Sequence, residues 1–488
     1  MSAELKKQER QTAMGKSDRC VVPAKPGNAG GGKAATLLPQ STRASAARRG
    51  GFTVLTRLDR ITERARKYPR EAFNNLYHHL DEDLLWYCFG LLNRDKAPGV
   101  DGVTVEDYER NLKENLQDLA RRLKQRSYRP WPSLRREIPK GEGKTRPLGL
   151  PALEDKLAQR ALAAILERVY EEDFYAFSFG FRPGRSCHDA LKELSRAIGT
   201  KKVEWIVDAD IKGFFDNVDH DWLMKMVAHR VKDPKVLWLI RRFLKAGVLV
   251  EGKCLETDKG VPQGGSISPL LANVYLHYVL DDWFAKVVKK HLRGEAYLVR
   301  YADDFVVCFQ YEDDARRFHK ALQQRLAKFK LELATAKTKI INFGRFAKRD
   351  ALRRGETKTP VFDFLGFTHY CGTSRAGRFK LKWRTSKKRF RLKLASIKEW
   401  LRENRILSLD DIWVTLNQKL AGHYQYYGVS DNWPWLEAFR KGVLWLAYRW
   451  LNRRSNRRSF TIPEFYAYVD RYGLVRPKRL VNLNSAFV

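Results

Sequence analysis

The chain has 488 residues, 44% of them hydrophobic, which is enough for about two to four structural units with a large buried core. Its 93 Lys and Arg residues outnumber its 56 Asp and Glu residues and give a formal charge of +37. This excess predicts a polyanionic partner such as nucleic acid. The charge alone does not distinguish an enzyme from a ribosomal or chromatin protein, or from a protein with a solvated basic surface. The sequence has no Cys-x-x-Cys pair to indicate a zinc ribbon, and no stretch approaches the roughly 20 apolar residues of a membrane span.

Cysteine usage and the N-terminus indicate the compartment. The six cysteines are scattered, which suits a reducing environment. The first ten residues are charged and lack an apolar core, so they do not resemble a secretory signal. We therefore expect a cytoplasmic, nucleic-acid-associated protein, from a bacterial-type cell or an organelle.

The N-terminal part of the chain is a basic tail followed by helical patterns. Residues 1–52 are rich in Gly, Ala, Ser, Lys and Arg and predict a disordered tail, which either orders on RNA or is a passive extension. The elements predicted next are, in chain order, a helix from residue 53, a Gly- and Pro-punctuated loop at 93–104, a helix at 105–126, a basic hairpin at 140–146 and a helix opened by Pro151.

The middle of the chain contains short apolar strands. Residues 205–207 predict a strand that ends in acids, and residues 299–309 predict a β-hairpin with a polar turn. Further candidate strands lie at 338–343 and 361–367, and a helix should begin near Ser268, an N-cap residue type that is followed by proline. A few antiparallel strands backed by helices define an α+β fold.

The chain after about residue 375 is strongly basic and mainly helical. Residues 379–393 mix cations with aromatic side chains. Helices are predicted at 387–404, 410–427 and 434–451. The basic stretch predicts phosphate contacts that position a nucleic acid without reading its sequence.

Two groups of acids follow the strands of the middle region. Asp208 and Asp210 come at the end of one strand, and Asp303 and Asp304 occupy the tip of the hairpin. Each group alone is weak evidence, because Asp is common in turns. Carboxylates that converge at the ends of neighbouring strands repel one another unless cations neutralise them. Two Mg²⁺ ions about 3.5–4 Å apart can activate a 3′-hydroxyl and stabilise a departing pyrophosphate.

The sequence around these acids resembles reverse transcriptases. Residues 299–307 (VRYADDFVV) resemble the family's hallmark hairpin, 206–216 (IVDADIKGFFD) its partner palm motif, and 260–270 (GVPQGGSISPL) its strand-to-helix motif beneath the incoming nucleotide. Further segments resemble group II intron reverse transcriptases in particular: 97–102 (APGVDG), 144–149 (KTRPLG), 179–186 (FGFRPGRS), 337–339 (KTK), 364–367 (FLGF) and 420–428 (LAGHYQYYG). The motifs follow the family's order over roughly residues 60 to 480.

The resemblance implies a right-hand polymerase, in which fingers and a palm with an antiparallel sheet precede an all-helical thumb and maturase domain. The implied division is a tail at 1–52, an N-terminal extension and fingers at 53–204, interleaved with the palm, a palm at 205–375 and the thumb and maturase domain at 376–488. Some members carry a C-terminal DNA endonuclease with His and Cys metal ligands. Because no cysteine follows Cys371, we expect this endonuclease to be absent.

The resemblance also implies a catalytic site. Asp210, Asp303 and Asp304 are the implied catalytic and metal-binding triad, and the carbonyl of Ile211 is a further candidate ligand. Asp208 competes with Asp210 in the first motif, but the family's acid directly precedes the Ile-Lys-Gly-Phe-Phe run. The implied cofactors are two Mg²⁺ ions, with Mn²⁺ as an alternative.

An implied dNTP site surrounds the triad. Lys140 and Arg146 would lie over the triphosphate, where cations offset developing charge. Lys337 would assist pyrophosphate departure, or alternatively contact a phosphate or the template. Gln263 would hydrogen-bond the sugar, and the two glycines after it would let the backbone approach the nucleotide closely.

The expected sugar gate is Phe215, whose ring would leave no room for a 2′-hydroxyl. Phe214 would then point to the opposite side of a strand and pack in the core. The alternative is that both rings are core residues.

Nucleic-acid contacts are implied in the Gly-Pro loop of the fingers, in the basic stretch and in the maturase-like segment, where tyrosines would stack on RNA bases. The residues concerned are Arg182, Arg185, Lys380, Lys382, Arg384, Lys387, Lys388, Arg389, Tyr424 and Tyr426. The two tyrosines would look the same as core aromatics of a helix. The tryptophans expected in the core are Trp413, Trp433, Trp435, Trp445 and Trp450.

The function implied by the resemblance is RNA-directed DNA polymerase activity in a group II intron protein that also binds its intron RNA and assists splicing and retrohoming. The partners would be the intron RNA, an RNA template with a DNA primer or target DNA, and dNTPs, with no membrane and with an open oligomeric state. Two alternatives stay open. One is a host-adopted relative in repair or defence, and the other is a maturase that only assists splicing.

Overall fold

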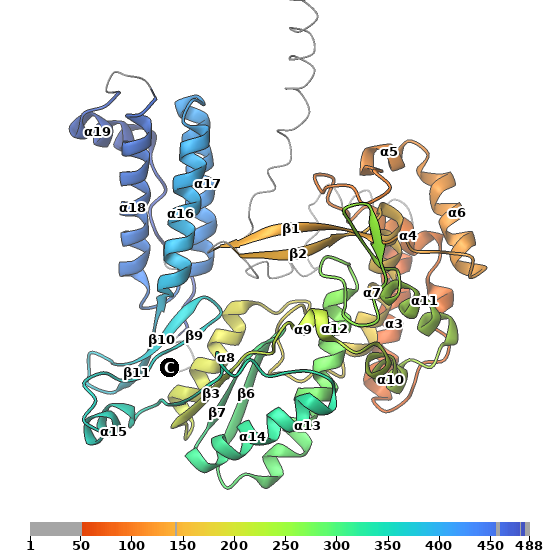
Figure 1. Cartoon of the computed structure of the whole chain (residues 1–488), viewed down its shortest axis with the longest axis horizontal. Helices are drawn as coiled ribbons and strands as arrows, with labels where there is room; N and C mark the ends of the chain where they lie inside the picture. Colours follow the sequence, from red (N-terminus) through yellow and green to blue (C-terminus); the bar gives the residue numbers. More distant parts are fainter. Residues whose placement is uncertain (1–50, 142–143, 455–458, 479, 484–488) are drawn as a thin grey trace, which may run out of the picture.

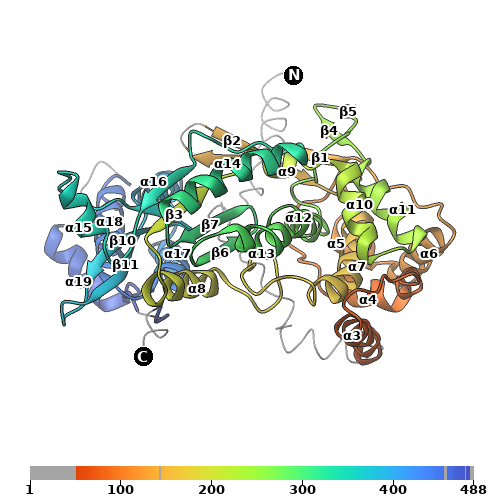
Figure 2. The ribbon, with the colours of Figure 1, turned by 90° about the horizontal axis from the view of Figure 1, so that it is seen from below.

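The computed structural model describes residues 51–141, 144–454, 459–478 and 480–483. The predicted tail, residues 1–52, lies outside the described residues except for its last two positions, which begin helix α3 (Gly51–Lys67). Figure 1 shows N-terminal helices at the right, a central sheet below and C-terminal helices at the upper left. In Figure 2 these three regions follow one another along the long axis, with the sheet in the middle.

The N-terminal region is a group of helices around the buried helix α7 (Leu153–Tyr170). The other helical elements of this region are α3, a 3-10 turn η1 (Tyr77–His79), α4 (Glu82–Phe89), α5 (Val105–Glu109), α6 (Leu112–Lys124), α10 (His220–Arg230) and α11 (Pro234–Leu244). The helix predicted at 105–126 is therefore two helices, because the chain leaves the helix at Arg110 and restarts after Asn111.

A four-stranded sheet in the order β2-β1-β4-β5 accompanies these helices. Its strands are β1 (Ser133–Gly141), β2 (Lys144–Leu150), β4 (Val248–Val250) and β5 (Lys253–Leu255). β1 pairs antiparallel with β2 and parallel with β4. The basic hairpin predicted at 140–146 is thus the tip of a longer β1–β2 hairpin, which reaches toward the C-terminal helices in Figure 1.

The central sheet has the order β6-β7-β3-β8, and every pairing in it is antiparallel. Its strands are β3 (Trp205–Ala209), β6 (Ala296–Tyr301), β7 (Asp304–Phe309) and β8 (Lys339–Asn342). Side chains alternate along a strand, so Val207 and Val307 lie in the core shared with the N-terminal helices, whereas Ile206 and Val306 lie in a second core. The neighbouring helical elements are α8 (Cys187–Thr200), α9 (Phe214–Asn217), α12 (Ser268–Leu276), the π-helix η2 (His277–Asp281), α13 (Asp282–Lys286), η3 (Val288–His291), α14 (Glu312–Lys328) and α15 (Ala347–Arg353).

The second core joins the other face of the central sheet to the C-terminal region. That region contains a three-stranded sheet in the order β11-β10-β9, followed by four helices. The elements are β9 (Phe362–Phe364), β10 (Phe367–Thr373), β11 (Phe379–Thr385), α16 (Lys387–Asn404), α17 (Leu409–Tyr427), α18 (Trp433–Leu451) and α19 (Ile462–Tyr472). The helices predicted at 387–404, 410–427 and 434–451 agree with α16, α17 and α18 to within one residue.

Two expectations for this region are wrong. The single strand predicted at 361–367 is a strand only over β9 (Phe362–Phe364), because Leu365 (φ +48°) and Gly366 (φ +79°) both have left-handed backbones and form a tight turn into β10. The first part of the basic stretch is strand β11, in which Leu381 and Trp383 are buried and alternate with cations. The helix begins only after Ser386, whose side chain accepts a hydrogen bond from the backbone N–H of Arg389.

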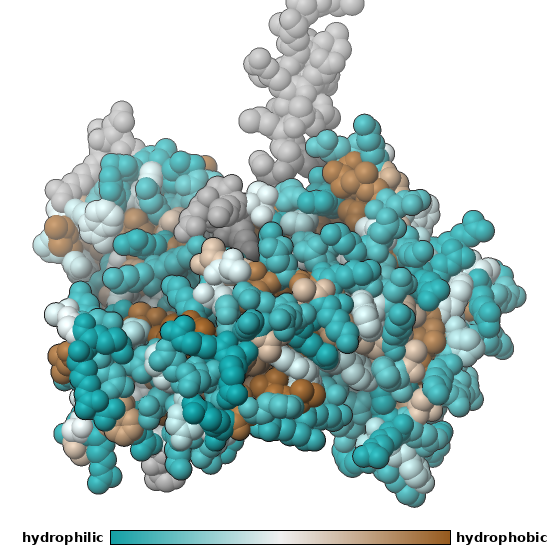
Figure 3. Space-filling model, turned by 60° about the horizontal axis from the view of Figure 1, so that its bottom comes forward, coloured by the Kyte–Doolittle hydropathy of each residue, from teal (hydrophilic) through white to brown (hydrophobic). Residues whose placement is uncertain are grey.

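The surface of the described residues is strongly polar. Figure 3 shows a face on which hydrophilic side chains predominate and apolar side chains occur in small patches. Among the described helices, none has an apolar stretch long enough to cross a bilayer.

Asp155 is a carboxylate inside the N-terminal core. It accepts hydrogen bonds from the Tyr128 hydroxyl and, at 3.0 Å, from the backbone N–H of Trp131, and so ties the segment before β1 to α7. Burial raises the pKa of Asp155 to about 7, because its effect exceeds that of the two hydrogen bonds, which lower the pKa.

Asp155→Asn should change how stability depends on pH. Since the pKa of Asp155 is higher in the folded protein than in the unfolded chain, the folded state keeps a proton that the unfolded chain loses, and stability falls as pH rises from about 4 to about 7. The amide does not titrate, so the variant should not lose stability in this way. Its free energy of unfolding, relative to that of wild type, should increase by on the order of 2 kcal/mol between these pH values. Thermal unfolding between pH 4.5 and 8 measures the difference, and exposed Asp313→Asn is the control. Parallel curves for wild type and Asp155→Asn would contradict the buried titration.

Candidate active site

The central sheet brings two carboxylates to facing positions at one of its ends. β3 and β7 pair in antiparallel register, with Ala209 opposite Phe305 as the last pair. The next positions along the two strands are Asp210 and Asp304, so these two acids lie across from each other. Tyr301 pairs with Asp304 across the β6–β7 hairpin, and Asp303 is in the two-residue turn between them.

These acids line a pocket with a volume of about 300 Å³. Its wall combines the central sheet with the β9–β10 turn, the start of α16 and the end of α17. The main lining residues are Asp208, Asp210, Asp304, Lys337, Asp363, Ser386, Lys388, Arg389, Tyr426 and Tyr427. The pocket is therefore built from segments that lie more than 200 residues apart in the chain.

The carboxylates of the pocket influence one another electrostatically. The Asp304 side chain reaches solvent, yet the pocket walls keep much of the water away from it. This desolvation is the main reason why the pKa of Asp304 is raised to about 7. The nearby charges of Asp303, Asp210 and Asp208 raise it further, in that order, and Arg389 lowers it. An ionised Asp304 thus needs a nearby cation.

Asp208 occupies a different place from Asp210. It lies inside the sheet, opposite Val306 on β7 and Lys339 on β8. Burial raises the pKa of Asp208 to about 7, and the charge of Lys339 opposes this increase. Asp210 instead lies at the open end of β3, in contact with the Lys337 ammonium. This difference favours Asp210 over Asp208 as the acid that would hold a metal.

The donor set fits a hard divalent cation. Asp210 and Asp304 offer carboxylate oxygens from facing positions, and Mg²⁺ prefers a few such oxygens together with phosphate oxygens. Ile211 follows Asp210 directly and forms an isolated bridge with Leu333. In the part of the chain that the structure describes, no three His, Cys, Asp or Glu side chains form a compact cluster that could hold a metal ion.

A larger cavity, of about 950 Å³, adjoins the acid pocket and shares Asp208, Lys337 and Lys388 with it. Its charged lining residues are Asp208, Lys337, Lys339, Asp363, Arg384, Lys387, Lys388 and Arg391. Six of these eight residues are cations, so the cavity favours an anion.

The two phenylalanines expected at the sugar gate lie on the short helix α9, not on a strand. Phe214 is 2% exposed and packs in the core, as predicted, whereas Phe215 is half-buried. The Phe215 ring makes edge contacts with the rings of Phe214 and Phe181 at 5.4 and 6.4 Å. Phe214 is therefore a core residue, and Phe215 packs against the same core with part of its ring exposed.

The loop with Gln263 packs against the β1–β2 sheet. The Gln263 carbonyl accepts a hydrogen bond from the backbone N–H of Gly149 at 2.6 Å, and its amide lies 3.4 Å from an Asp216 carboxylate oxygen. Gly264 has φ +120°, and a Cβ added there would lie 2.2 Å from the Gly149 oxygen. The glycine that was expected to approach a nucleotide is therefore needed for packing against β2.

The cations expected over the triphosphate come from the β1–β2 hairpin. Arg146 lies on β2 opposite Ile138 and is partly exposed. The backbone of Lys140 lies in β1, but its side chain lies outside the described residues.

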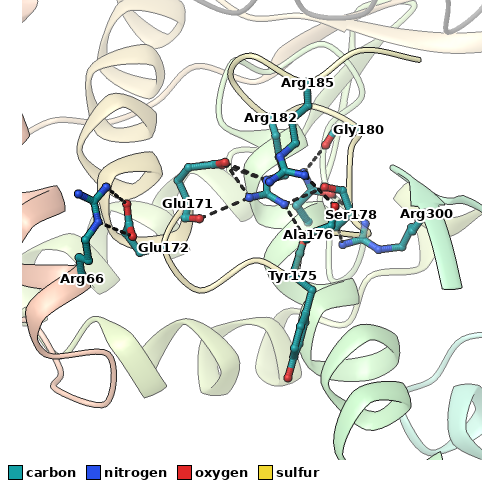
Figure 4. Close-up of polar contacts among 11 residues, drawn as sticks. Arg66, Glu171, Glu172, Tyr175, Ala176, Ser178, Gly180, Arg182, Arg185 and Arg300 are labelled. Atoms are coloured by element: carbon teal, nitrogen blue, oxygen red, sulfur yellow. Dashed lines mark hydrogen bonds and ion pairs between the residues drawn. The ribbon is translucent and has the colours of Figure 1, made fainter. Parts of the chain in front are cut away.

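The expectation that Arg182 grips the template is wrong for this conformation. Arg182 is 4% exposed, and its guanidinium donates to the Glu171 carboxylate at 2.7 Å and to the carbonyls of Tyr175 and Ser178, both at 2.7 Å (Figure 4). Arg185 is more exposed, and it donates to the Ala176 carbonyl at 2.7 Å. The Gly-Pro loop is therefore pinned from inside by Arg182.

The basic stretch presents its cations in two ways. Lys380 forms an ion pair with Asp431 at 2.8 Å, and Lys382 and Arg384 are partly exposed on the same strand. Lys387, Lys388 and Arg389 are exposed in the first turn of α16. These last three residues are the cations that are most available to an anion.

The two tyrosines of the maturase-like segment differ. Tyr424 is 3% exposed in the second core, so the expectation that it stacks on RNA bases is wrong and the core alternative holds. Tyr426 is partly buried, and its hydroxyl donates to the Leu365 carbonyl at 2.8 Å beside the acid pocket. Among the tryptophans, Trp413 and Trp450 are buried, but Trp433 and Trp445 are 50% and 56% exposed, which contradicts the prediction for these two.

Some residues that matter for the site were not predicted. Asp363 lines the acid pocket, and Arg300, Asn273 and Asp281 hold the hairpin from behind. The sequence could have indicated the role of Arg300, because a charged residue between apolar strand positions is rarely buried without an oppositely charged partner.

Facing carboxylates on adjacent antiparallel strands, beside a hairpin turn, are the arrangement of a nucleic-acid polymerase palm. Residues 138–369 match the family described as reverse transcriptase (RNA-dependent DNA polymerase). This part of the chain is therefore similar to reverse transcriptase domains.

Curated relatives connect this domain with group II introns. The chain is 40% identical over 222 residues to the group II intron-encoded protein LtrA of Lactococcus lactis subsp. cremoris, a match that covers 45% of this chain and 37% of LtrA. It is 38% identical over 203 residues to the protein YkfC of Escherichia coli, which covers 41% of this chain and 52% of YkfC. It is 26% identical over 204 residues to the nuclear intron maturase 3 of Arabidopsis thaliana, which covers 37% of this chain and 28% of that protein.

The chain is therefore homologous to the group II intron-encoded protein LtrA and to an intron maturase, and it spans about half or less of the length of each of these three relatives. A telomerase structure from Candida albicans is also similar, with a TM-score of 0.39 at 14% identity, over 71% of this chain and 64% of that chain.

Gly264→Ala should destabilise the junction between the Gln263 loop and β2. The added Cβ would both clash with Gly149 and require a left-handed backbone that alanine disfavours, which should cost about 2–4 kcal/mol of unfolding free energy. Gly102→Ala is the matched control, because Gly102 also has a left-handed backbone but nothing within 4 Å of an added Cβ. Equal losses in urea unfolding would mean that the close approach to Gly149 is unimportant.

Proposed function

We propose that the protein is the RNA-directed DNA polymerase of a group II intron, which adds dNTPs to a primer 3′-hydroxyl. The observation that carries this proposal is the facing position of Asp210 and Asp304 at the end of the central sheet, inside a domain that matches reverse transcriptases. A protein that only bound RNA would gain nothing from a carboxylate, Asp304, whose pKa is raised by three neighbouring acids.

Asp210, Asp303 and Asp304, with the carbonyl of Ile211, are the proposed ligands of two Mg²⁺ ions, or of Mn²⁺ in their place. When bound, these ions would lower the pKa of the primer hydroxyl and offset negative charge at the leaving group. The chain's own contribution is to hold the carboxylates in a partly desolvated pocket, where electrostatic interactions are stronger than in water.

Other side chains of the site would orient the nucleotide. Lys337 contacts Asp210 in this structure, and an ammonium at this place can turn to the phosphates of an incoming dNTP. Arg146 and Lys140 would contact the triphosphate from the β1–β2 hairpin, and Gln263 would contact the sugar. Phe215 is the proposed barrier to a 2′-hydroxyl.

A template and primer would lie along the cavity next to the acids. Its lysines and arginines supply phosphate contacts, and the exposed first turn of α16 extends them. Lys380, Lys382, Arg384 and Arg185 are partly exposed, so they are the remaining candidates for RNA backbone contacts. Binding of intron RNA, assistance in splicing and retrohoming are the proposed activities of the C-terminal region.

Asp304→Asn should abolish primer extension. Loss of one metal-binding carboxylate should reduce synthesis by on the order of a thousandfold while leaving the fold intact, because the side chain makes few packing contacts at the turn. Extension of a DNA primer on an RNA template, with dNTPs and Mg²⁺, measures the effect, and exposed Asp313→Asn should retain wild-type activity.

If wild type makes no DNA but still promotes splicing of its flanking RNA, the splicing-only maturase is correct. If wild type makes DNA but neither binds nor splices an intron RNA, the host-adopted relative is correct.

Phe215→Ala should relax sugar discrimination. Without the ring, a 2′-hydroxyl fits, and the preference for dNTPs over rNTPs in kcat/KM should fall by about tenfold or more. Phe214→Ala is the contrasting variant, because it empties a core site and should lower stability without changing the preference. An unchanged preference in Phe215→Ala would remove Phe215 from the gate.

A further inference from the structure

Arg300 is a buried arginine whose guanidinium is fully used inside the palm. Its Nε donates to Asp281 at 2.7 Å, and Nη2 completes a two-pronged ion pair in which both side chains are fully buried. Nη1 donates to the Asn273 side-chain oxygen at 3.0 Å and to the Ala302 carbonyl at 2.9 Å, and Nη2 also donates to the Ser178 hydroxyl at 2.7 Å. A guanidinium has five N–H donors, and these five hydrogen bonds use all of them.

The partners of Arg300 come from three segments that are distant in sequence. Asn273 lies on α12 and Asp281 ends the π-helix that follows, both downstream of the Gln263 loop. Ser178 lies in the segment before α8, and Figure 4 shows it between Arg300 and Arg182. Ala302 is the first residue of the turn that carries the acids. One side chain therefore joins the nucleotide-side helix, a fingers segment and the catalytic hairpin.

The turn itself is closely confined. Ala302 has φ +57°, a left-handed backbone that is uncommon for a residue with a Cβ. Its carbonyl accepts a hydrogen bond from Arg300, and its amide nitrogen lies so near Gly180 that a Cβ added to Gly180 would be 2.2 Å from it. Because Asp303 and Asp304 follow directly, the conformation of Ala302 sets the direction of both carboxylates.

The confining segment is held on its other side by Arg182. Arg182 donates to the Ser178 carbonyl, while Arg300 donates to the Ser178 hydroxyl. The backbone between them forms a short parallel bridge with β6, in which Phe179 N–H donates to the Arg300 carbonyl at 2.8 Å. Asn273 also donates to the Gly180 carbonyl at 2.7 Å. The segment thus lies between two buried arginines, pressed against the turn.

We propose that Arg300 is a positioning residue for the catalytic acids. It holds the turn of the β6–β7 hairpin so that Asp303 and Asp304 face Asp210 despite their mutual repulsion. It acts through the carbonyl of Ala302 and touches none of the reacting atoms. The inference rests on the proposed polymerase function, because it assigns a purpose to a buried network behind the metal-binding acids.

Lysine cannot replace arginine in this role. An ammonium offers three donors from one nitrogen atom, so it can keep the ion pair with Asp281 but cannot also reach Ala302, Ser178 and Asn273 from fixed directions. Arg300→Lys therefore keeps the positive charge but loses the hydrogen bonds to Ala302, Ser178 and Asn273, so it is the variant to test.

Arg230→Lys is the matched control. Arg230 is also buried, pairs with Asp173 at 2.7 Å and donates to the carbonyls of Tyr68 and Glu71. It ties the end of α10 to the N-terminal region and has no contact with the hairpin. The two variants therefore lose similar buried hydrogen bonds, but only one loses them behind the acids.

Three measurements separate positioning from stability. They are thermal unfolding, deuterium uptake of peptides that cover residues 299–305 in metal-free protein, and the Mg²⁺ concentration for half-maximal primer extension. Both variants should unfold at a lower temperature than wild type. Only Arg300→Lys should raise deuterium uptake at 299–305 and raise the half-maximal Mg²⁺ concentration, by about tenfold, the usual effect of removing a group that supports a metal ligand.

The outcomes distinguish the inference from the proposed function. Equal deuterium uptake and equal Mg²⁺ dependence in the two variants would overturn the positioning role. No synthesis by wild type would overturn the polymerase, while the deuterium uptake would still report on the turn. If Arg300→Lys does not fold, Ser178→Ala removes one of the five hydrogen bonds, and it should raise the half-maximal Mg²⁺ concentration by about threefold with increased uptake at 299–305. A wild-type Mg²⁺ dependence in Ser178→Ala would then overturn the inference.

Discussion

Repulsion between carboxylates is the constraint on which this structure depends. Asp210 and Asp304 face each other at the end of a sheet, with Asp303 and Asp208 close enough to influence the pKa of Asp304. Such a group is unfavourable for folding unless cations and a rigid frame offset it. Lys337 contacts Asp210, and Arg389 lowers the pKa of Asp304, so cations of the chain partly neutralise the acids from the solvent side. The rigid frame lies behind them, in the buried network of Arg300.

The two faces of the central sheet pack into separate cores. One face packs on the N-terminal helices and on α12 to α14, which carry the nucleotide-side loop and the partners of Arg300. The other face packs on the C-terminal region, and Tyr426 reaches from α17 to the Leu365 carbonyl at the edge of the acid pocket. The His188 ring also bonds to the Tyr426 carbonyl, at 2.8 Å. The C-terminal helices are therefore part of the active-site wall and not an appendage.

The sequence was informative where a residue's role depends on its immediate neighbours. The acids at the ends of apolar strands, the hairpin at 299–309 and the three helices after residue 386 follow from short-range patterns, and the structure has them at the predicted places. It was misleading where a side chain's burial depends on how its segment packs. Arg182 and Tyr424 lie in segments that suggest RNA contacts, but Tyr424 is buried in the second core, and the Arg182 guanidinium turns inward to Glu171, Tyr175 and Ser178. The glycine at 264 has a close neighbour that the sequence did not indicate, because a Cβ there would lie 2.2 Å from the Gly149 oxygen of β2.

The same distinction changes how the formal charge of +37 is understood. A cation in a buried pair contributes to the total but makes no contact with a phosphate. Arg182, Arg230 and Arg300 are of this kind, since each is almost fully buried and is paired with an acid. Lys387, Lys388 and Arg389 are exposed; Lys388 and Arg389 line the acid pocket, and Lys387 lines the adjoining cavity. Arginine suits the buried pairs because its five N–H donors have fixed directions, and long flexible side chains suit the exposed positions because their charged ends reach into solvent. The basic character of the chain therefore has two parts, one that is paired with acids inside the fold and one that is exposed beside the acid pocket.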